Sequence, residues 1–147
     1  MTLVELIVAF TVLLILSAMA VPLARAKIQA ERARAYRRAI TEVRNAIDKY
    51  KDNCDQGYFG PPKLGTNCYP ETLEILVEGQ KLAQSADGKK LRLLRHIPKD
   101  PITNTFDWGL RSDQDDVNST SWGGQDVFDI YTKSTDKGPD GTPYASW

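Results

Sequence analysis

An uncharged run of nineteen residues near the N-terminus constrains this chain more than any other feature. Positions 6–24 carry no charged side chain and consist mostly of Leu, Ile, Val, Ala and Phe. As an α-helix they would span roughly 29 Å, close to the ~30 Å thickness of the hydrocarbon core of a bilayer. A cleaved secretory signal is the alternative, but it needs a basic segment before the apolar run and, after it, a small-residue cleavage site followed by a change of composition. This sequence shows neither, because the helical pattern continues without a break. The run therefore predicts a transmembrane helix.

Two residues in this first segment break local rules. Glu5 places a carboxylate at the edge of the apolar run, where it either faces the positive end of the helix dipole among lipid headgroups or pairs with a cation. No Lys or Arg lies within reach on this helix, so the second interpretation takes the cation from another chain, as the free amino group of a neighbour's Met1. Pro22 removes the amide that would bond the Ala18 carbonyl, and the helical pattern continues beyond it, so we expect a kink there.

The helical pattern extends well past the uncharged run. Apolar or small residues recur at steps of three or four, which fits one face of a helix and is incompatible with a strand. This stripe consists of Ala26, Ala30, Ala33, Tyr36, Ile40, Val43, Ile47 and Tyr50. Its alanines would let other helices approach closely, whereas its larger residues would seat a sheet. We therefore expect one helix from residue 2 to about 52, whose lower half packs with identical helices and whose upper half is the spine of a head.

The charges balance overall but are unevenly distributed. The chain has 19 basic and 19 acidic residues, so no global field favours nucleic acid as a partner. The basic segment, residues 23–51, contains nine Lys or Arg and three acids, whereas the acidic segment, residues 100–147, contains nine Asp and three Lys or Arg. These two segments would either make complementary contacts between neighbouring copies or remain two solvated faces that never meet.

Two cysteines follow the predicted helix and flank a loop rich in Gly and Pro. Cys54 and Cys68 suit a disulfide in an oxidising compartment, with free thiols as the alternative. Closing about fifteen residues would stabilise the fold by roughly 3 kcal/mol in the chain-entropy model. The sequence has no CxxC or CxxCH motif, so it supports neither a zinc ribbon nor a c-type haem.

The remaining sequence predicts a small head that contains both helix and strand. Residues 70–78 fit a short helix that starts with Pro and stops at Gly79, and residues 90–97 fit a helix slightly better than a strand. Residues 106–110 and 127–132 fit strands. The expected fold class is therefore α+β: a long N-terminal helix, first transmembrane and then stalk, with a small antiparallel β-sheet head packed on its C-terminal half. The segments are expected at 1–24 for the span, 25–52 for the stalk and 53–147 for the head.

Both ends of the sequence resemble one known family. The start MTLVELI, followed by an apolar helix and Pro22, resembles the mature start of a type IV pilin or pseudopilin. In the C-terminal half the segments IPKDP, DW, FDIY and DGT resemble the major pseudopilin of type II secretion systems, which implies about three strands in the head. The resemblance also implies that a prepilin peptidase removes a leader, that the new amino group of Met1 is methylated, and that Glu5 recruits and registers the incoming subunit. The usual first residue of the family is Phe, so Met1 departs from its pattern.

The resemblance further implies a location and a function. The N-terminus would face the cytoplasm, with one pass through the inner membrane and the head in the periplasm. By the positive-inside rule alone, Arg25 and Lys27 would instead place the stalk in the cytoplasm. The chain would be a structural subunit of a pseudopilus that drives protein export across the outer membrane. Its partners would be its own copies, the prepilin peptidase, an inner-membrane assembly platform, minor pseudopilins and a secretin complex.

Two other functions are weighed against this one. A type IV pilus subunit for adhesion, motility or DNA uptake is the nearest alternative, and a membrane-anchored enzyme or receptor domain is an alternative from another class. The single histidine, His96, has no convergent Cys or Ser partner, and the sequence contains no phosphate loop or nucleophile elbow. We therefore expect no catalytic residues and no enzymatic activity.

Residues 132–141 form the one candidate metal site. Calcium takes about six to eight oxygen ligands, and this stretch offers the hydroxyls of Thr132 and Thr135 and the carboxylates of Asp136 and Asp140. The resemblance implies calcium binding in the corresponding loop, with the two Asp as ligands. The alternative is an Asp/Gly/Pro turn packed by the terminal aromatic residues. Two lysines interrupt the stretch and it lacks the spacing of an EF-hand, which favours the turn.

Overall fold

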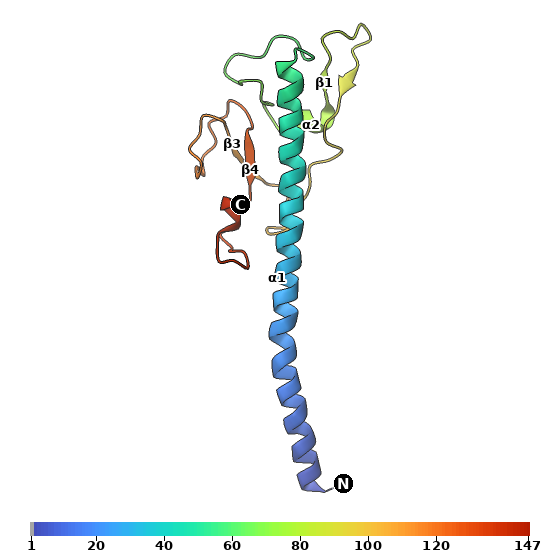
Figure 1. Ribbon diagram of the computed structural model, residues 1–147, viewed down its shortest axis with the longest axis vertical. Coiled ribbons are helices and arrows are strands. Elements are labelled where there is room, and N and C mark those ends of the chain that lie inside the picture. Colours follow the sequence, from blue (N-terminus) through green and yellow to red (C-terminus); the bar gives the residue numbers. More distant parts are fainter. Residues whose placement is uncertain (1) are drawn as a thin grey trace.

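The computed structural model describes residues 2–147, and its main element is one long helix that carries a small head on its C-terminal half (Figure 1). Helix α1 (Leu3–Asp55) has 53 residues and spans about 80 Å at the helical rise. Beyond it the chain folds back, and every later element lies beside the upper half of α1 (Figure 1). The protein is therefore α+β, with the long helix and the antiparallel strands expected from the sequence.

Helix α1 begins and continues as its sequence pattern predicts. Thr2 is the N-cap, with extended backbone and a side-chain oxygen that accepts the Glu5 amide at 3.4 Å. The helix passes through Pro22 without ending, so the expected continuity to about residue 52 is confirmed, and the helix ends at Asp55. The kink expected at Pro22 stays a prediction.

The upper half of α1 buries one face against the head. The buried residues repeat at helical spacing and include every member of the predicted stripe from Ala33 onward. They are Ala33, Tyr36, Ala39, Ile40, Val43, Ala46, Ile47, Tyr50 and Cys54. Lower in the stripe Ala26 is exposed and Ala30 is half-buried, so the head sits on the portion with large side chains. Full burial of one large apolar side chain stabilises a fold by about 1.5–3 kcal/mol, which makes this face the main attachment of the head.

The sheet that packs on α1 has two strands. Strand β3 (Gly109–Arg111) pairs antiparallel with β4 (Asp129–Tyr131), and β4 contacts α1. Gly109 is required where it lies, because a Cβ there would fall 2.3 Å from the Tyr131 ring. Strand β4 lies within the predicted range 127–132, whereas β3 starts three residues later than predicted.

A second sheet lies at the tip of the head (Figure 1). Strands β1 (Gln80–Lys81) and β2 (Lys90–Leu91) pair antiparallel, so the helix favoured for residues 90–97 is wrong. The helical periodicity of this segment is weak, and its first residues pair with β1 instead. That pairing cannot be predicted from the local sequence pattern, because it depends on contact with another segment. The resemblance implied about three strands, and the described residues form four, in two separate sheets.

Helix α2 (Glu74–Glu78) is shorter than predicted, since it starts four residues beyond position 70. It stops as expected at Gly79, whose φ of 89° is left-handed and disfavours other residues. A Cβ at Gly79 would also approach the Arg92 side chain to 2.8 Å. Leu76 of α2 is fully buried, so this short helix adds to the core, and a 3-10 turn, η1 (Tyr144–Ser146), lies at the end of the chain.

The disulfide expected from the sequence is present. It joins Cys54, near the end of α1, to Cys68 in the following loop, with the two Cα atoms 5.5 Å apart. Both cysteines are buried in the core. The bond therefore ties the top of α1 to the loop that leads into α2.

Candidate membrane and assembly surface

The lower half of α1 is apolar and is not covered by the rest of the protein. An 18-residue window of this helix has a mean hydropathy of 2.6, and none of it is buried. Leu3, Leu14 and Met19 are 77%, 70% and 72% exposed. Contiguous apolar surface of this extent marks a membrane or protein interface. The helix is long and apolar enough to cross a membrane, and its surface requires lipid or other helices as a cover.

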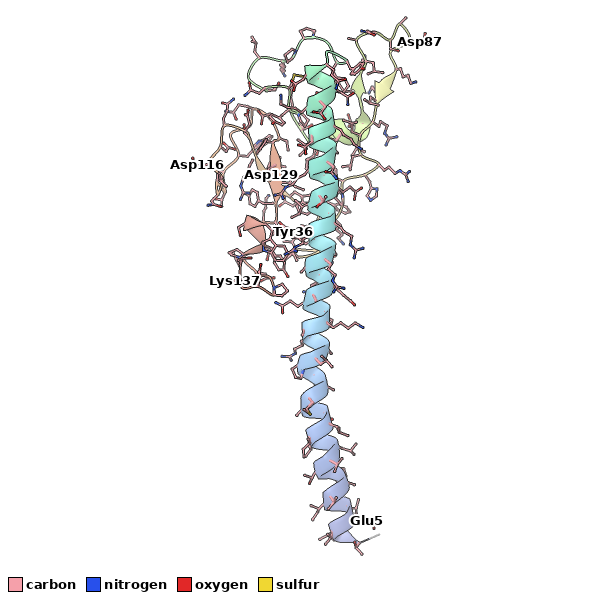
Figure 2. The ribbon with its side chains drawn as sticks, viewed as in Figure 1. Glu5, Tyr36, Asp87, Asp116, Asp129 and Lys137 are labelled. Atoms are coloured by element: carbon pink, nitrogen blue, oxygen red, sulfur yellow. A yellow bond between two sulfur atoms is a disulfide. The ribbon has the colours of Figure 1, made fainter. Side chains whose placement is uncertain are left out.

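Glu5 lies at the end of α1 farthest from the head (Figure 2). With Thr2 it has the Thr-x-x-Glu spacing of a capping box, in which the Thr2 hydroxyl oxygen accepts the Glu5 amide. Its side chain is exposed and makes no ion pair with any residue from 2 to 147. The negative charge of the carboxylate therefore stabilises the positive, N-terminal end of the helix dipole. The same carboxylate can bind a cation from another molecule. Met1, the expected site of processing and methylation, lies outside the described residues.

Tyr36 fastens the head to α1. Its ring stacks on Trp108 with centroids 6.0 Å apart and meets Tyr144 edge-on at 5.4 Å. Its hydroxyl oxygen accepts the buried Thr132 amide at 3.0 Å. Burial raises the pKa of Tyr36 to about 12, so the side chain stays neutral at physiological pH. One aromatic residue of the stripe thus binds the head both by packing and by a hydrogen bond.

One ion pair joins the basic segment to the acidic segment. Arg44 donates to both carboxylate oxygens of Asp129, at 2.6 and 3.0 Å, and also to the Trp147 carbonyl at 2.9 Å. The second cation beside Asp129 is Arg111, 4.0 Å away. Forked contacts of a guanidinium with a carboxylate are directional as well as strong. Arg44 therefore fixes how β4 and the C-terminus sit on the helix.

The structure places the four candidate calcium ligands in different surroundings, and calcium binding there stays a prediction. Thr132 is fully buried, and its hydroxyl donates to Asp100 at 2.5 Å. One oxygen of Asp140 accepts the hydroxyl and the amide of a neighbouring threonine, and these hydrogen bonds lower the pKa of Asp140. Thr135 and Asp136 are exposed on the same segment. In residues 2–147 no three His, Cys, Asp or Glu side chains come together as a metal site, and Asp140 instead stabilises a turn.

Two aspartates of the head are fully buried but differ in their hydrogen bonds. Asp100 accepts from two hydroxyls and one amide. Asp126 accepts the Asp113 amide at 3.2 Å through one oxygen, and its other oxygen has no partner within the described protein. Burial raises the pKa of Asp126 to about 6, and the nearby Asp113 carboxyl adds to the effect. Asp126 is therefore a buried carboxylate that costs stability at neutral pH.

A hollow of about 410 Å³ lies between the head and the exposed part of α1. It is lined by Arg25, Ile28, Gln29 and Arg32 of α1 and by Ile102, Asp136, Lys137 and Tyr144 of the head. Figure 2 shows Lys137 at the lower edge of the head, beside the helix. None of the basic side chains in this hollow is among the ion pairs of the described residues. Three cations without an ion pair among the described residues therefore lie where the head overhangs the stalk.

Sequence reasoning missed three of these features. The capping box is readable from the Thr2–Glu5 spacing, which is a recognised signature of a helix start. The burial of Asp126 and the hollow at Arg25 and Lys137 have no local signal, because they depend on how distant segments pack.

Comparisons with known proteins supply no relative. No family model, no curated protein and no solved structure matches this chain. The long apolar N-terminal helix and the small antiparallel head are consistent with a pilin-like shape. The function is therefore inferred from the residues and surfaces of the protein itself.

Proposed function

We propose that this chain is a structural subunit of a type II secretion pseudopilus, a member of the type IV pilin-like superfamily most similar to the major pseudopilin. The subunit polymerises through α1, and growth of the filament drives secreted proteins across the outer membrane. It acts by assembly and not by catalysis, and its apolar helix makes the contacts on which assembly depends.

The observation that carries the proposal is the uncovered apolar half of α1. Residues 3–29 are exposed, while the head covers the other half of the helix. Apolar surface is stabilised by about 25 cal/mol per Å² when it leaves water, so a bare helix of this kind is unfavourable in solution. Lipid covers it in a membrane, and identical helices cover it in a filament. A subunit can exchange one cover for the other without unfolding.

Glu5 gives this exchange a defined register. A carboxylate among apolar side chains is costly unless it is paired. In the filament its partner is the amino group of Met1 on a neighbouring subunit, made available by the prepilin peptidase. Because such a pair has one favourable geometry, it sets how far one helix slides along the next. The Glu5 carboxylate at the tip of α1, which makes no ion pair among residues 2–147, supports this role.

The subunit is held in the inner membrane, with its N-terminus in the cytoplasm and its head in the periplasm, until it is used. An ATP-driven assembly platform extracts it into the periplasmic filament, where minor pseudopilins and the secretin complex are further partners. The Cys54–Cys68 disulfide supports this location of the head, because structural disulfides persist in oxidising compartments such as the periplasm.

Substitution of Glu5→Val tests the proposal in cells. Filaments are imaged by electron microscopy and secretion is measured in the same cultures. The variant is expected to insert into the membrane but not to polymerise, and secretion is expected to stop. The matched control is Asp87→Val, which removes an exposed carboxylate from the tip of the head (Figure 2) and should leave filaments and secretion unchanged.

Two results would contradict the proposal. Normal polymerisation of Glu5→Val would remove the role given to this carboxylate. A long surface fibre on wild-type cells at normal expression, with secretion intact when the chain is deleted, would favour a type IV pilus subunit for adhesion, motility or DNA uptake.

A further inference from the structure

The hollow between the head and α1 lies at the level where the apolar surface of the helix ends. Positions 6–24 are uncharged, and Arg25, the first cation beyond them, lines the hollow. Arg32 also lines it and lies roughly 10 Å farther along the helix by the helical rise. Lipid headgroups occupy roughly 5–8 Å beyond each side of the hydrocarbon core. With residues 6–24 in the hydrocarbon core, the Arg25 end of the hollow therefore opens into the headgroup layer, and its Arg32 end lies a few Å beyond that layer.

The charge of the hollow suits an anion. Arg25 and Arg32 from α1 and Lys137 from the head contribute three cations, against which Asp136 is the one acidic side chain in the lining. These three cations take part in none of the ion pairs formed within residues 2–147, in contrast to Arg44, which is neutralised by the head. A guanidinium binds phosphate oxygens through two parallel hydrogen bonds, and a lysine adds a point charge.

The hollow also has an apolar part. Ile28 is 54% exposed on the helix, and Ile102 lines the facing side from the head. An inorganic anion gains nothing from these two side chains, whereas the glycerol and first methylenes of a phospholipid would contact them. Ligand sites commonly combine an apolar lining with a few placed polar groups that fix orientation.

We infer that this hollow binds the phosphate headgroup of an anionic phospholipid from the leaflet on the head side of the membrane. The inference rests on the membrane anchoring in the proposed function. It also accounts for Arg25, whose position on that side of the membrane runs against the positive-inside rule. The bound lipid holds the head against the membrane surface, and the subunit releases it on leaving for the filament.

The test uses the full chain in nanodiscs of equal parts phosphatidylcholine and phosphatidylglycerol. The protein is released in mild detergent, and native mass spectrometry gives the ratio of retained phosphatidylglycerol to retained phosphatidylcholine. The test variant carries both Arg32→Gln and Lys137→Gln. The control variant carries Arg38→Gln and Lys90→Gln, which remove the same charge from exposed residues outside the hollow. Each basic residue near an anionic surface contributes about fivefold to binding, so the ratio should fall at least tenfold in the first variant only.

Each outcome decides between named alternatives. The wild-type chain is expected to prefer phosphatidylglycerol, and inorganic phosphate in excess should leave that lipid bound, since its apolar contacts remain. Displacement of the lipid by phosphate would make the hollow a simple anion site. An equal loss of phosphatidylglycerol preference in both variants would mean that overall charge, and not the hollow, attracts the lipid. Either result overturns the inference. A chain that inserts into the nanodiscs but shows no preference refutes the inference alone. A chain that does not insert refutes the membrane anchor of the proposed function as well.

Discussion

Replacement of Asp126 by Asn is expected to stabilise the head at neutral pH. The buried carboxylate has one oxygen without a hydrogen-bond partner and lies beside Asp113. The Asp126→Asn side chain has the same shape and keeps an oxygen that can accept the Asp113 amide. It also gains an N–H that can donate to the neighbouring carboxylate. The change therefore removes a buried charge without opening a cavity.

The magnitude follows from the pKa of Asp126, which burial raises from 3.8 to about 6. Each pKa unit corresponds to about 1.36 kcal/mol, so the charged form costs at most about 3 kcal/mol at a pH of about 7.5. Because the folded pKa lies above the unfolded value, the folded state binds the proton more tightly. The cost is therefore absent well below pH ~4, grows as the pH rises from ~4 to ~6, and is constant above. At a pH of about 4.5 it amounts to about 1 kcal/mol.

Urea unfolding of the full chain in mild detergent measures this difference. Trp108 is 4% exposed, so its fluorescence reports the loss of the core. Asp126→Asn should raise the free energy of unfolding by about 2–3 kcal/mol near neutral pH and by about 1 kcal/mol near pH 4.5. The matched control is Asp116→Asn, which removes the same charge from an exposed residue of the same loop and should change the value by less than about 0.5 kcal/mol.

The dependence on pH separates this explanation from its rivals. An equal gain from Asp116→Asn would show that the whole acidic loop is relieved by losing any one charge. A gain from Asp126→Asn that stays the same from neutral to acid pH would come from packing and not from ionisation. A loss of stability near neutral pH would refute the reasoning, because it would mean that the carboxylate is favourable where it lies.

Two further changes test how the head is held together. Tyr36→Phe keeps the aromatic packing but leaves the buried Thr132 amide without its acceptor, so it should cost about 1–3 kcal/mol in the same unfolding measurement; no cost would mean that the hydrogen bond contributes nothing. Reduction of the Cys54–Cys68 disulfide should lower the free energy of unfolding by roughly 3 kcal/mol, and a variant with Ser at both positions should match the reduced protein and no longer respond to reductant; an unchanged urea midpoint on reduction would contradict this.

Helix α1 was predictable because its signals are local and extend over many turns. Nineteen uncharged residues indicate a helix of membrane length, and a stripe with steps of three and four indicates its continuation. The point where the stripe changes from Ala to larger residues also marked where the head would attach. The structure buries Tyr36, Ile40 and Val43 there, and leaves the part of the helix below them largely exposed.

The head was harder to predict because its elements are only two to five residues long. At this length local preference is weak, and pairing between distant segments decides the outcome. Residues 90–97 show this, since their first two residues pair with β1 and the expected helix does not form. The turn at Gly79 and the disulfide were predictable even so, because glycine and cysteine act through chemistry that needs little context.

The two charged segments are not two solvated faces that never meet, and a complementary contact between neighbouring copies stays a prediction. They do meet within one chain, but through one carboxylate. Asp129 forms an ion pair with Arg44 and so holds the head against the helix. The cations at the lower end of the stalk, Arg25 and Arg32, have no acid paired with them in the described chain and line the hollow instead. The acidic loop around Asp116 lies on the side of the head away from α1 (Figure 2), so it cannot neutralise them. Surface pairs at fixed positions contribute to recognition more than to stability. This outward loop is consequently the part of the acidic segment from which a complementary contact with another copy is expected.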